Sequence, residues 1–177
     1  YTNAKKYNER VILLTSNEDM NALHSNVITE MYAIDKYVNL ASFFKSIYRH
    51  MSTNSESSEM FNFQRIMILY EFMKEKELET VFFMDNCILL NTNVSDLKLD
   101  TDKTYYCIPD NTKKPYRWSA SLHTALVSLE FLGNFISTCN EYYQNETKLQ
   151  TLEEKYKFHQ DTQQGGGICA MTLLYLF

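Results

Sequence analysis

Apolar residues recur at helical spacing in two long segments of the chain. Between residues 37 and 48, and again between residues 132 and 143, they stand three or four positions apart. This spacing places the apolar side chains on one face of an α-helix. We therefore predict helices over residues 37–48 and 129–144.

A third helix is predicted over residues 59–76, after a polar loop at residues 52–58 whose last serines can cap it. Its central residues 66–70 are apolar in every direction, so we expect them to be buried between two layers. A charged segment at residues 149–157 predicts a further helix. Four aromatic residues of the helices at 37–48 and 59–76 are predicted to lie in the core: Phe43, Phe44, Phe61 and Phe63.

Short apolar and β-branched runs, bounded by polar residues, predict strands buried on both faces. These runs lie at residues 10–15, 80–84 and 103–108, with a shorter apolar run at 88–90 and a weaker strand at 120–127. Strands that alternate with helices, with few hairpin signals between them, predict an α/β fold. We expect one central sheet that contains residues 11–14 and 81–84, with helices on its faces.

The composition is that of one folded domain. The chain has 177 residues, of which 45% are hydrophobic, and it holds four glycines and two prolines. This apolar content can offset the conformational entropy lost on folding. Lys and Arg number 17 against 22 Asp and Glu, and the net charge of −5 argues against nucleic acid as a partner. No run reaches the about 18 apolar residues of a transmembrane helix, so we expect no membrane span.

The chain ends and the cysteines bear on where the protein works. The chain starts at Tyr1 and ends in an apolar run, from which we expect it to be part of a longer protein. Its four cysteines stand 20 to 32 residues apart without a C-x-x-C pair, which argues against structural zinc and against a disulfide scaffold. We expect reduced cysteines and a cytoplasmic location, which leaves peripheral attachment to a membrane open.

Two charged residues stand out by their positions. Asp85 directly follows the strand at 80–84, where ligands bind in open α/β sheets, so its carboxylate could ligate a divalent cation that bridges phosphates. The alternative is that Asp85 caps the following turn. Arg65 lies among apolar helix residues, and a guanidinium is almost never buried without an anionic partner. That partner is either a substrate phosphate or, the interpretation we favour, Glu71 or Asp85.

Glycines and histidines supply the remaining candidates. Three consecutive glycines at 165–167 permit close approach of a ligand to the backbone, although no phosphate-binding motif surrounds them and a plain turn is the favoured interpretation. No two histidines have metal-ligand spacing. His50 follows a helix, while His24 and His159 lie among polar residues. His123 interrupts a strand, where it is either structural or in contact with a substrate hydroxyl.

Four segments together resemble the nucleotide-sugar-dependent glycosyltransferases of the GT-A fold, in particular microbial enzymes that build surface polysaccharides. The segments are residues 41–52 (ASFFKSIYRHMS), residues 61–66 (FNFQRI) with Phe72 and Met73, residues 83–90 (FMDNCILL) and residues 166–174 (GGICAMTLL). The resemblance runs from about Val11 to the last residue. It implies a single GT-A-like domain over residues 1–177, with the first βα unit missing or only partly present.

The resemblance implies a donor site and an acceptor side. In such enzymes a D-x-D motif holds Mn²⁺ or Mg²⁺ on the diphosphate of the donor, and Asp85 matches its first carboxylate. Arg65 matches a helix arginine that contacts the same nucleotide. Their sequence neighbours Gln64 and Asn86 are assigned to the donor site with them. The sugar or acceptor side is assigned three residues: His123, Gly166 and Gly167.

Two positions depart from the family pattern. Cys87 stands where the second carboxylate of D-x-D is expected, and Ala170 stands where similar proteins often carry an acid. A thiol is a soft ligand that suits Mn²⁺ and Mg²⁺ poorly, so the metal site should be weak. The resemblance implies transfer of a sugar from a nucleotide diphosphate donor to a glycan or lipid-linked acceptor. The alternative is a catalytically silent GT-A-like module that serves binding or assembly.

Overall fold

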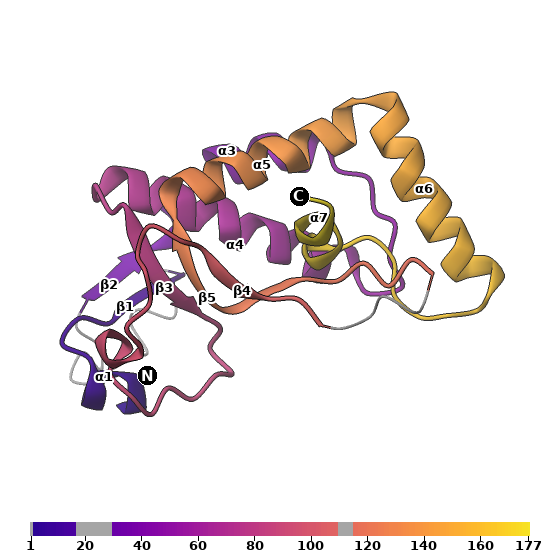
Figure 1. Ribbon diagram of the computed structural model, residues 1–177. Coiled ribbons are helices and arrows are strands. Elements are labelled where there is room, and N and C mark those ends of the chain that lie inside the picture. Colours follow the sequence, from indigo (N-terminus) through magenta and orange to yellow (C-terminus); the bar gives the residue numbers. More distant parts are fainter. Residues whose placement is uncertain (1, 17–29, 110–114) are drawn as a thin grey trace.

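The computed structural model describes residues 2–16, 30–109 and 115–177 (Figure 1). The helices are α1 (Thr2–Tyr7), α3 (Asn39–Ile47), α4 (Glu56–Glu75), α5 (Leu129–Gln144), α6 (Glu146–Asp161) and α7 (Ala170–Leu176). The strands are β1 (Ile12–Thr15), β2 (Glu30–Ala33), β3 (Thr80–Met84), β4 (Tyr105–Cys107) and β5 (Ser121–Ser128). Short 3₁₀ helices lie at Ile34–Lys36 and Val94–Leu97. The fold is mixed α/β, as the pattern predicted.

The strands form two small sheets in the described part of the chain. β1 and β2 pair in parallel, whereas β5 pairs antiparallel with β3 on one side and with β4 on the other. The prediction of one sheet containing residues 11–14 and 81–84 is therefore wrong, although both segments are strands. Local apolar spacing identifies extended segments, but strand partners depend on where the helices hold those segments in space.

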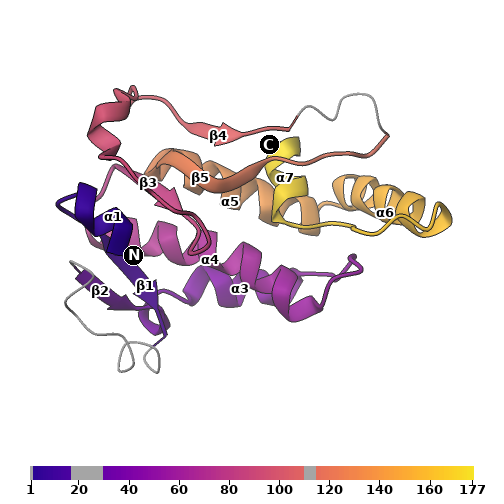
Figure 2. The same ribbon diagram turned by 90° about the horizontal axis from the view of Figure 1, so that it is seen from below.

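Helix α4 is the centre of the core. It packs against both α3 and α5 (Figure 2). Residues 66–69 are buried, as predicted, because this stretch is apolar in every direction and must be covered from more than one side. A serine caps the helix, but it is Ser55 and not one of the last serines of the predicted loop: its side chain accepts a hydrogen bond from Ser58 N, so the helix begins at Glu56, before the predicted start at residue 59.

The aromatic residues of α3 and α4 divide between core and surface. Phe44 and Phe63 are buried with ring centroids 4.9 Å apart. The prediction that Phe43 and Phe61 also lie in the core is wrong, because these side chains are 45% and 55% exposed. Successive residues of a helix point about 100° apart, so Phe43 cannot share the face of Phe44, nor Phe61 that of Phe63.

Most of the other predicted elements are present with shifted ends. α5 has the predicted bounds. It begins after Ser128, whose side chain caps the helix by accepting a hydrogen bond from Phe131 N in the first turn. α6 is longer than residues 149–157, since Asn145 caps it one turn earlier. β4 and β5 confirm the two later strands, but the apolar run at 88–90 is not a strand. α1, β2 and α7 were not predicted.

α6 lies at the end of the molecule opposite β1 and β2 (Figures 1 and 2). The side chain of Lys155 on α6 donates a hydrogen bond to Gly167 O in the turn that follows the helix. α6 therefore packs against the segment that leads into α7. None of the helices in residues 2–16, 30–109 and 115–177 is both long enough and apolar enough to cross a membrane.

The three glycines form a turn that is held against the loop between α3 and α4. Thr53 N donates to Gly166 O at 3.1 Å, and Ile168 N donates to Met51 O at 2.7 Å. Gly167 has a φ of 152°, and a Cβ atom there would lie 2.3 Å from Met51 O. Only glycine fits at this position, whereas a Cβ at Gly165 would meet nothing within 4 Å.

We therefore expect Gly167→Ala to lower the free energy of unfolding by about 2 kcal/mol or more, because the methyl group collides with the backbone in a strained conformation. Gly165→Ala is the matched control, and its stability should be unchanged or slightly higher. Urea denaturation of the three proteins measures the difference. Equal stability of the two variants would show that the two backbones do not meet at Gly167.

Candidate functional site

Three of the predicted site residues meet at the carboxyl end of β3. Arg65 comes from the middle of α4, Asp85 directly follows β3, and His123 lies in β5. The antiparallel pairing of β3 with β5 brings the last two together, and Asp85 N donates to His123 O at 2.9 Å. Arg65 Nη1 donates to Asp85 Oδ1, and His123 Nδ1 contacts Asp85 Oδ2. The carboxylate therefore joins a helix to two strands.

Burial differs sharply across this cluster. The side chain of Asp85 is 10% exposed, whereas that of His123 is 51% exposed. The guanidinium of Arg65 lies over the ring of Phe83, with 5.8 Å between its Cζ and the ring centroid. Arg65 Nε is buried, and no residue of the described chain accepts a hydrogen bond from it. The cluster thus has a buried anion, a partly unsatisfied cation and an exposed imidazole.

The structure decides between the partners that the sequence left open for Arg65. Asp85 is the partner, and Glu71 has another role: its carboxylate accepts hydrogen bonds from Leu40 N at 2.8 Å and Asn39 N at 3.3 Å. These amides form the start of α3, so Glu71 satisfies free donors at a helix N-terminus. The structural interpretation of Arg65 is confirmed, and a substrate phosphate remains a proposal.

Asp85 does not cap the following turn with its side chain. Its backbone carbonyl closes that turn by accepting a hydrogen bond from Ile88 N at 3.0 Å, while the carboxylate faces Arg65 and His123. The next two residues, Asn86 and Cys87, are exposed. Within the described residues, no three His, Cys, Asp or Glu side chains gather as ligands for a metal ion.

The other predicted site residues lie in different surroundings. Gln64 is half-buried on α4, next to Arg65. Gly166 and Gly167 belong to the turn before α7, and Ala170 is buried at the start of that helix. No hydrogen bond or ion pair of the described residues joins this turn to Asp85. The nearest connection runs through β5, because Ala120 N, just before the strand, donates to Met171 O at 3.0 Å.

A buried pair on α6 was missed in the sequence. Lys155 is 3% exposed, and its Nζ donates to His159 Nε2 at 2.8 Å and to Gly167 O at 2.9 Å. His159 is 8% exposed although its neighbours in the sequence are polar. Both residues continue the stripe of Leu149 and Leu152 at spacings of three and four, which is the signal that could have identified them. His24 lies outside the described residues.

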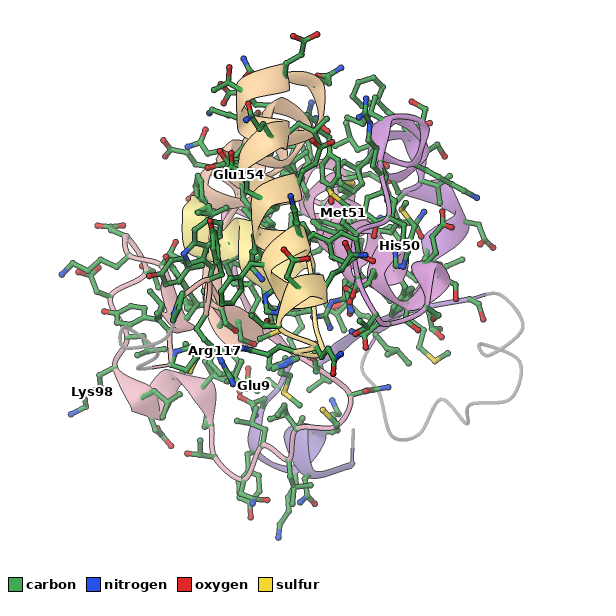
Figure 3. All side chains as sticks on the ribbon, turned by 90° about the vertical axis from the view of Figure 1, so that its right-hand side faces the viewer. Glu9, His50, Met51, Lys98, Arg117 and Glu154 are labelled. Atoms are coloured by element: carbon green, nitrogen blue, oxygen red, sulfur yellow. The ribbon has the colours of Figure 1, made fainter. Side chains whose placement is uncertain are left out.

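Burial governs the charge state of this pair. Desolvation lowers the pKa of Lys155. Desolvation also lowers the pKa of His159, and the positive charges of Lys155 and Arg117 lower it further. The backbone groups of Gln164 and Tyr116 raise the pKa of His159 in turn. Neither of them accepts a hydrogen bond of good geometry from Nδ1. In Figure 3, Arg117 lies on one side of α6 and His50 and Met51 lie on the other.

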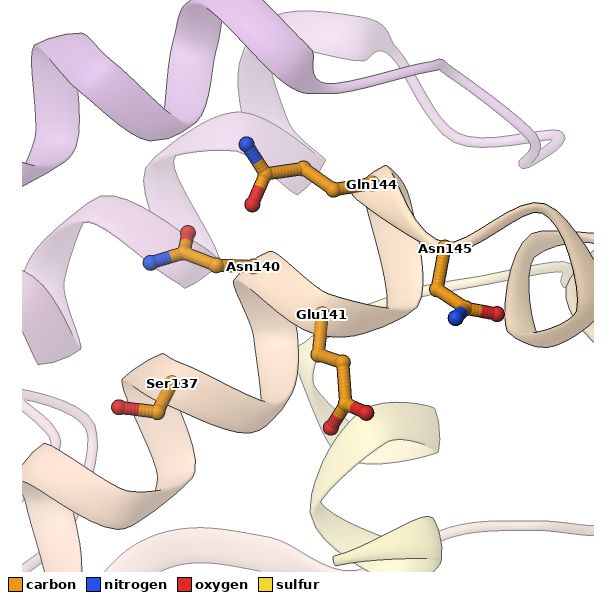
Figure 4. Close-up of a pocket in the computed structure, with 5 residues that line it drawn as sticks. All are labelled: Ser137, Asn140, Glu141, Gln144 and Asn145. Atoms are coloured by element: carbon orange, nitrogen blue, oxygen red, sulfur yellow. The ribbon is translucent and has the colours of Figure 1, made fainter.

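Two surface pockets lined by described residues lie away from the Asp85 cluster. The α5 pocket, of about 430 Å³, is lined by Ser137, Asn140, Glu141, Gln144 and Asn145. Figure 4 shows that Asn140 and Gln144 point to one side of α5 and Glu141 to the other. The α6 pocket, of about 410 Å³, is lined by Thr53, Tyr156, His159, Gln160, Gln163, Gln164 and Gly165. It adjoins the glycine turn that was assigned to the acceptor side.

The four cysteines are all free, in agreement with the prediction of reduced thiols.

Comparison of the chain with protein-family models, with curated proteins and with solved structures gave no match. The function must therefore be argued from the site.

The Arg65–Asp85 pair allows a double-mutant cycle. We expect Asp85→Asn and Arg65→Met each to lower the free energy of unfolding by about 2 kcal/mol, because each leaves the other group unpaired in a partly buried place. The double variant should lose less than the sum, with a coupling of about 1 kcal/mol or more. Lys103→Met, in the exposed ion pair with Asp100, should change nothing measurable. Additive losses in chemical denaturation would contradict the pairing.

The Lys155–His159 pair predicts a pH dependence. Because the pKa of His159 is lower in the folded protein than its ordinary value of about 6.5, the unfolded chain takes up this proton first as the pH falls. The stability that neutral His159 contributes is therefore complete above about pH 6.5 and is lost as the pH falls below it. The free energy of unfolding should be lower at about pH 5.5 than at about pH 7.5, and His159→Gln should reduce this difference.

Lys155→Met should raise the pKa of His159 toward its ordinary value, because the neighbouring positive charge is removed while burial remains. Lys157→Met, an exposed position on the same helix, is the control and should leave this pKa unchanged. Titration of the His159 ring proton by NMR measures both. A pKa that is the same in the two variants would mean that Lys155 does not face the imidazole.

Proposed function

We propose that this chain is a glycosyltransferase of GT-A-like fold, which moves a sugar from a nucleotide diphosphate donor to a glycan or lipid-linked acceptor. The observation that supports it best is the meeting of Arg65, Asp85 and His123, which come from three separate elements. They lie together where β3 ends, on one edge of the three-stranded sheet.

Arg65 is the proposed contact to the donor diphosphate. A guanidinium offers five N–H donors in a planar fork that matches phosphate oxygens, and only one nitrogen of Arg65 is used by Asp85. Phe83 supports the guanidinium plane from one side. Gln64 and Asn86, on either side of this group, add amide donors that can bind the nucleotide. Asp85 holds the arginine in place for this contact.

The side chains at this end of β3 do not form a metal cage without a substrate. Asp85 is the one carboxylate of the D-x-D segment, and both of its oxygens face cationic or imidazole groups. The Cys87 thiol is soft and exposed. Mg²⁺ and Mn²⁺ are commonly held by one or two carboxylates together with substrate phosphates, so the donor set fits a metal that arrives with the nucleotide. Such an ion would neutralise charge on the departing diphosphate.

His123 is the proposed contact on the sugar side. Its Nδ1 faces Asp85, which leaves Nε2 as the ring nitrogen that a sugar hydroxyl can meet. Half of the side chain is exposed, so a ligand can reach it. Gly166 and Gly167 would support the acceptor from the rigid turn before α7, because two backbone hydrogen bonds hold this turn against the loop at Met51 and Thr53.

The second candidate is a silent GT-A-like module that binds or assembles without transferring a sugar. It is favoured by the pairing of both Asp85 oxygens and by the exposed thiol of Cys87 in place of the second carboxylate. The buried methyl group of Ala170 favours it as well, because similar proteins often carry an acid there.

Calorimetry with UDP and GDP, each with Mn²⁺, separates the two candidates. For the transferase, Cys87→Asp should tighten Mn²⁺ binding in the presence of the nucleotide by about tenfold, because it restores a hard oxygen ligand. Arg65→Gln should weaken nucleotide binding by about tenfold, the effect of a lost charge-assisted hydrogen bond. Cys107→Asp, at an exposed cysteine on β4, is the control and should change neither affinity.

If Cys87→Asp folds normally and Mn²⁺ affinity does not rise, Asp85 is not a metal ligand and the D-x-D correspondence fails. If neither UDP nor GDP binds to the wild type or to Cys87→Asp, the silent module is the better description.

A further inference from the structure

The α6 pocket carries an inference of its own. It lies between α6 and the glycine turn, and its volume of about 410 Å³ is within the usual range for small-molecule sites. One wall is the side chain of Thr53 from the loop before α4, so the pocket joins that loop to the distant stretch formed by the end of α6 and the turn that follows it.

We propose that the α6 pocket binds a neutral sugar unit through its amide, hydroxyl and aromatic side chains. The assignment of this sugar unit to the acceptor rests on the proposed function, in which the adjoining turn of Gly166 and Gly167 lies on the acceptor side. The binding itself requires no transferase activity.

The charge of the lining favours a neutral ligand over an ion. Among the described residues, no Asp, Glu, Lys or Arg lines the pocket, so these residues offer neither a hard cage for a metal nor a paired cation for a phosphate. His159 is the titratable imidazole of the lining, and its lowered pKa favours the uncharged ring. The pocket also lies at the C-terminal end of α6, where the helix dipole is negative and disfavours anions.

The hydrogen-bonding groups of the lining match hydroxyls. The side chains of Gln160, Gln163 and Gln164 each carry an acceptor oxygen and an NH₂ donor, and neighbouring hydroxyls of a sugar ring both donate and accept. All three side chains are exposed, so they are open to a ligand. The ring of Tyr156 supplies an apolar surface for the C–H face of a sugar.

The tautomer of His159 leaves a buried donor unpaired next to the pocket. Lys155 donates to Nε2, so the proton of the neutral ring is assigned to Nδ1. Nδ1 is buried and finds no acceptor of good geometry in the described chain.

The frame of the pocket is held before any ligand arrives. Gly166 N donates to the hydroxyl oxygen of Thr53 at 3.0 Å, and Gln164 N donates to His159 O at 3.0 Å. From inside the protein, Lys155 Nζ donates a hydrogen bond to Gly167 O at 2.9 Å. A site whose walls are already fixed loses less entropy on binding, which allows weak polar contacts to give measurable affinity.

NMR titration with sugars tests this proposal. The probes are the neutral disaccharides cellobiose and lactose, together with glucuronate and inorganic phosphate as anionic comparisons. A neutral disaccharide should shift the backbone and side-chain amide signals of Gln160, Gln164 and Gly165, with a dissociation constant in the millimolar range. Gln160→Leu and Gln164→Leu should each weaken this binding about fivefold, the effect of one neutral hydrogen bond. Gln150→Leu, on α6 outside the pocket, should leave it unchanged.

Three results would overturn the proposal: no disaccharide binding up to about 100 mM, tighter binding of phosphate or glucuronate than of both disaccharides, or signal shifts that lie away from the pocket. The test is separate from that of the donor site. If the disaccharides bind and the nucleotides do not, the sugar site stands and the transferase proposal fails. If the nucleotides bind and the disaccharides do not, the sugar site fails alone.

Discussion

The burial of α4 on several sides is the constraint on which the rest of the structure depends. Its residues 66–69 are apolar in every direction, so the helix must be covered by α3, by α5 and by further apolar side chains. Arg65 stands immediately before this stretch and therefore lies where a cation needs an anion. Asp85 supplies the anion from the end of β3, and in doing so it links the helical layer to the three-stranded sheet.

The same requirement, that a buried polar group must be paired, shapes the N-terminal end of α4. Glu59 is buried in the first turn, and its carboxylate accepts hydrogen bonds from Ser52 Oγ at 3.0 Å and Asn54 Nδ2 at 2.7 Å. These contacts hold the loop before α4, and that loop in turn holds the glycine turn. Lys155 fastens the turn from its other side. One helix thus positions both the Asp85 cluster and, through its preceding loop, the wall of the α6 pocket.

The two regions have different chemical character, which suits a transferase with two substrates. The Asp85 cluster combines a guanidinium, a carboxylate and an imidazole, groups that can bind and stabilise a charged diphosphate. The α6 pocket is lined by amides, a hydroxyl, a tyrosine ring and an imidazole, groups that suit an uncharged hydroxylated ligand. A silent module would retain the pocket while the altered metal motif leaves Asp85 in its ion pair.

The sequence by itself determined the local elements. Helical spacing located α3 and α5, and a polar capping loop before an apolar stretch located α4. The need of Arg65 for an anion limited its candidate protein partners to Glu71 and Asp85. Only the tertiary structure decided that Asp85 is that partner, that β3 pairs with β5 and not with β1, and that Lys155 and His159 occupy core positions under the glycine turn. The physical reason is how far apart in the sequence the interacting residues lie. Apolar spacing reports which face of one element is covered, whereas strand pairing and buried polar contacts depend on residues far apart in the chain.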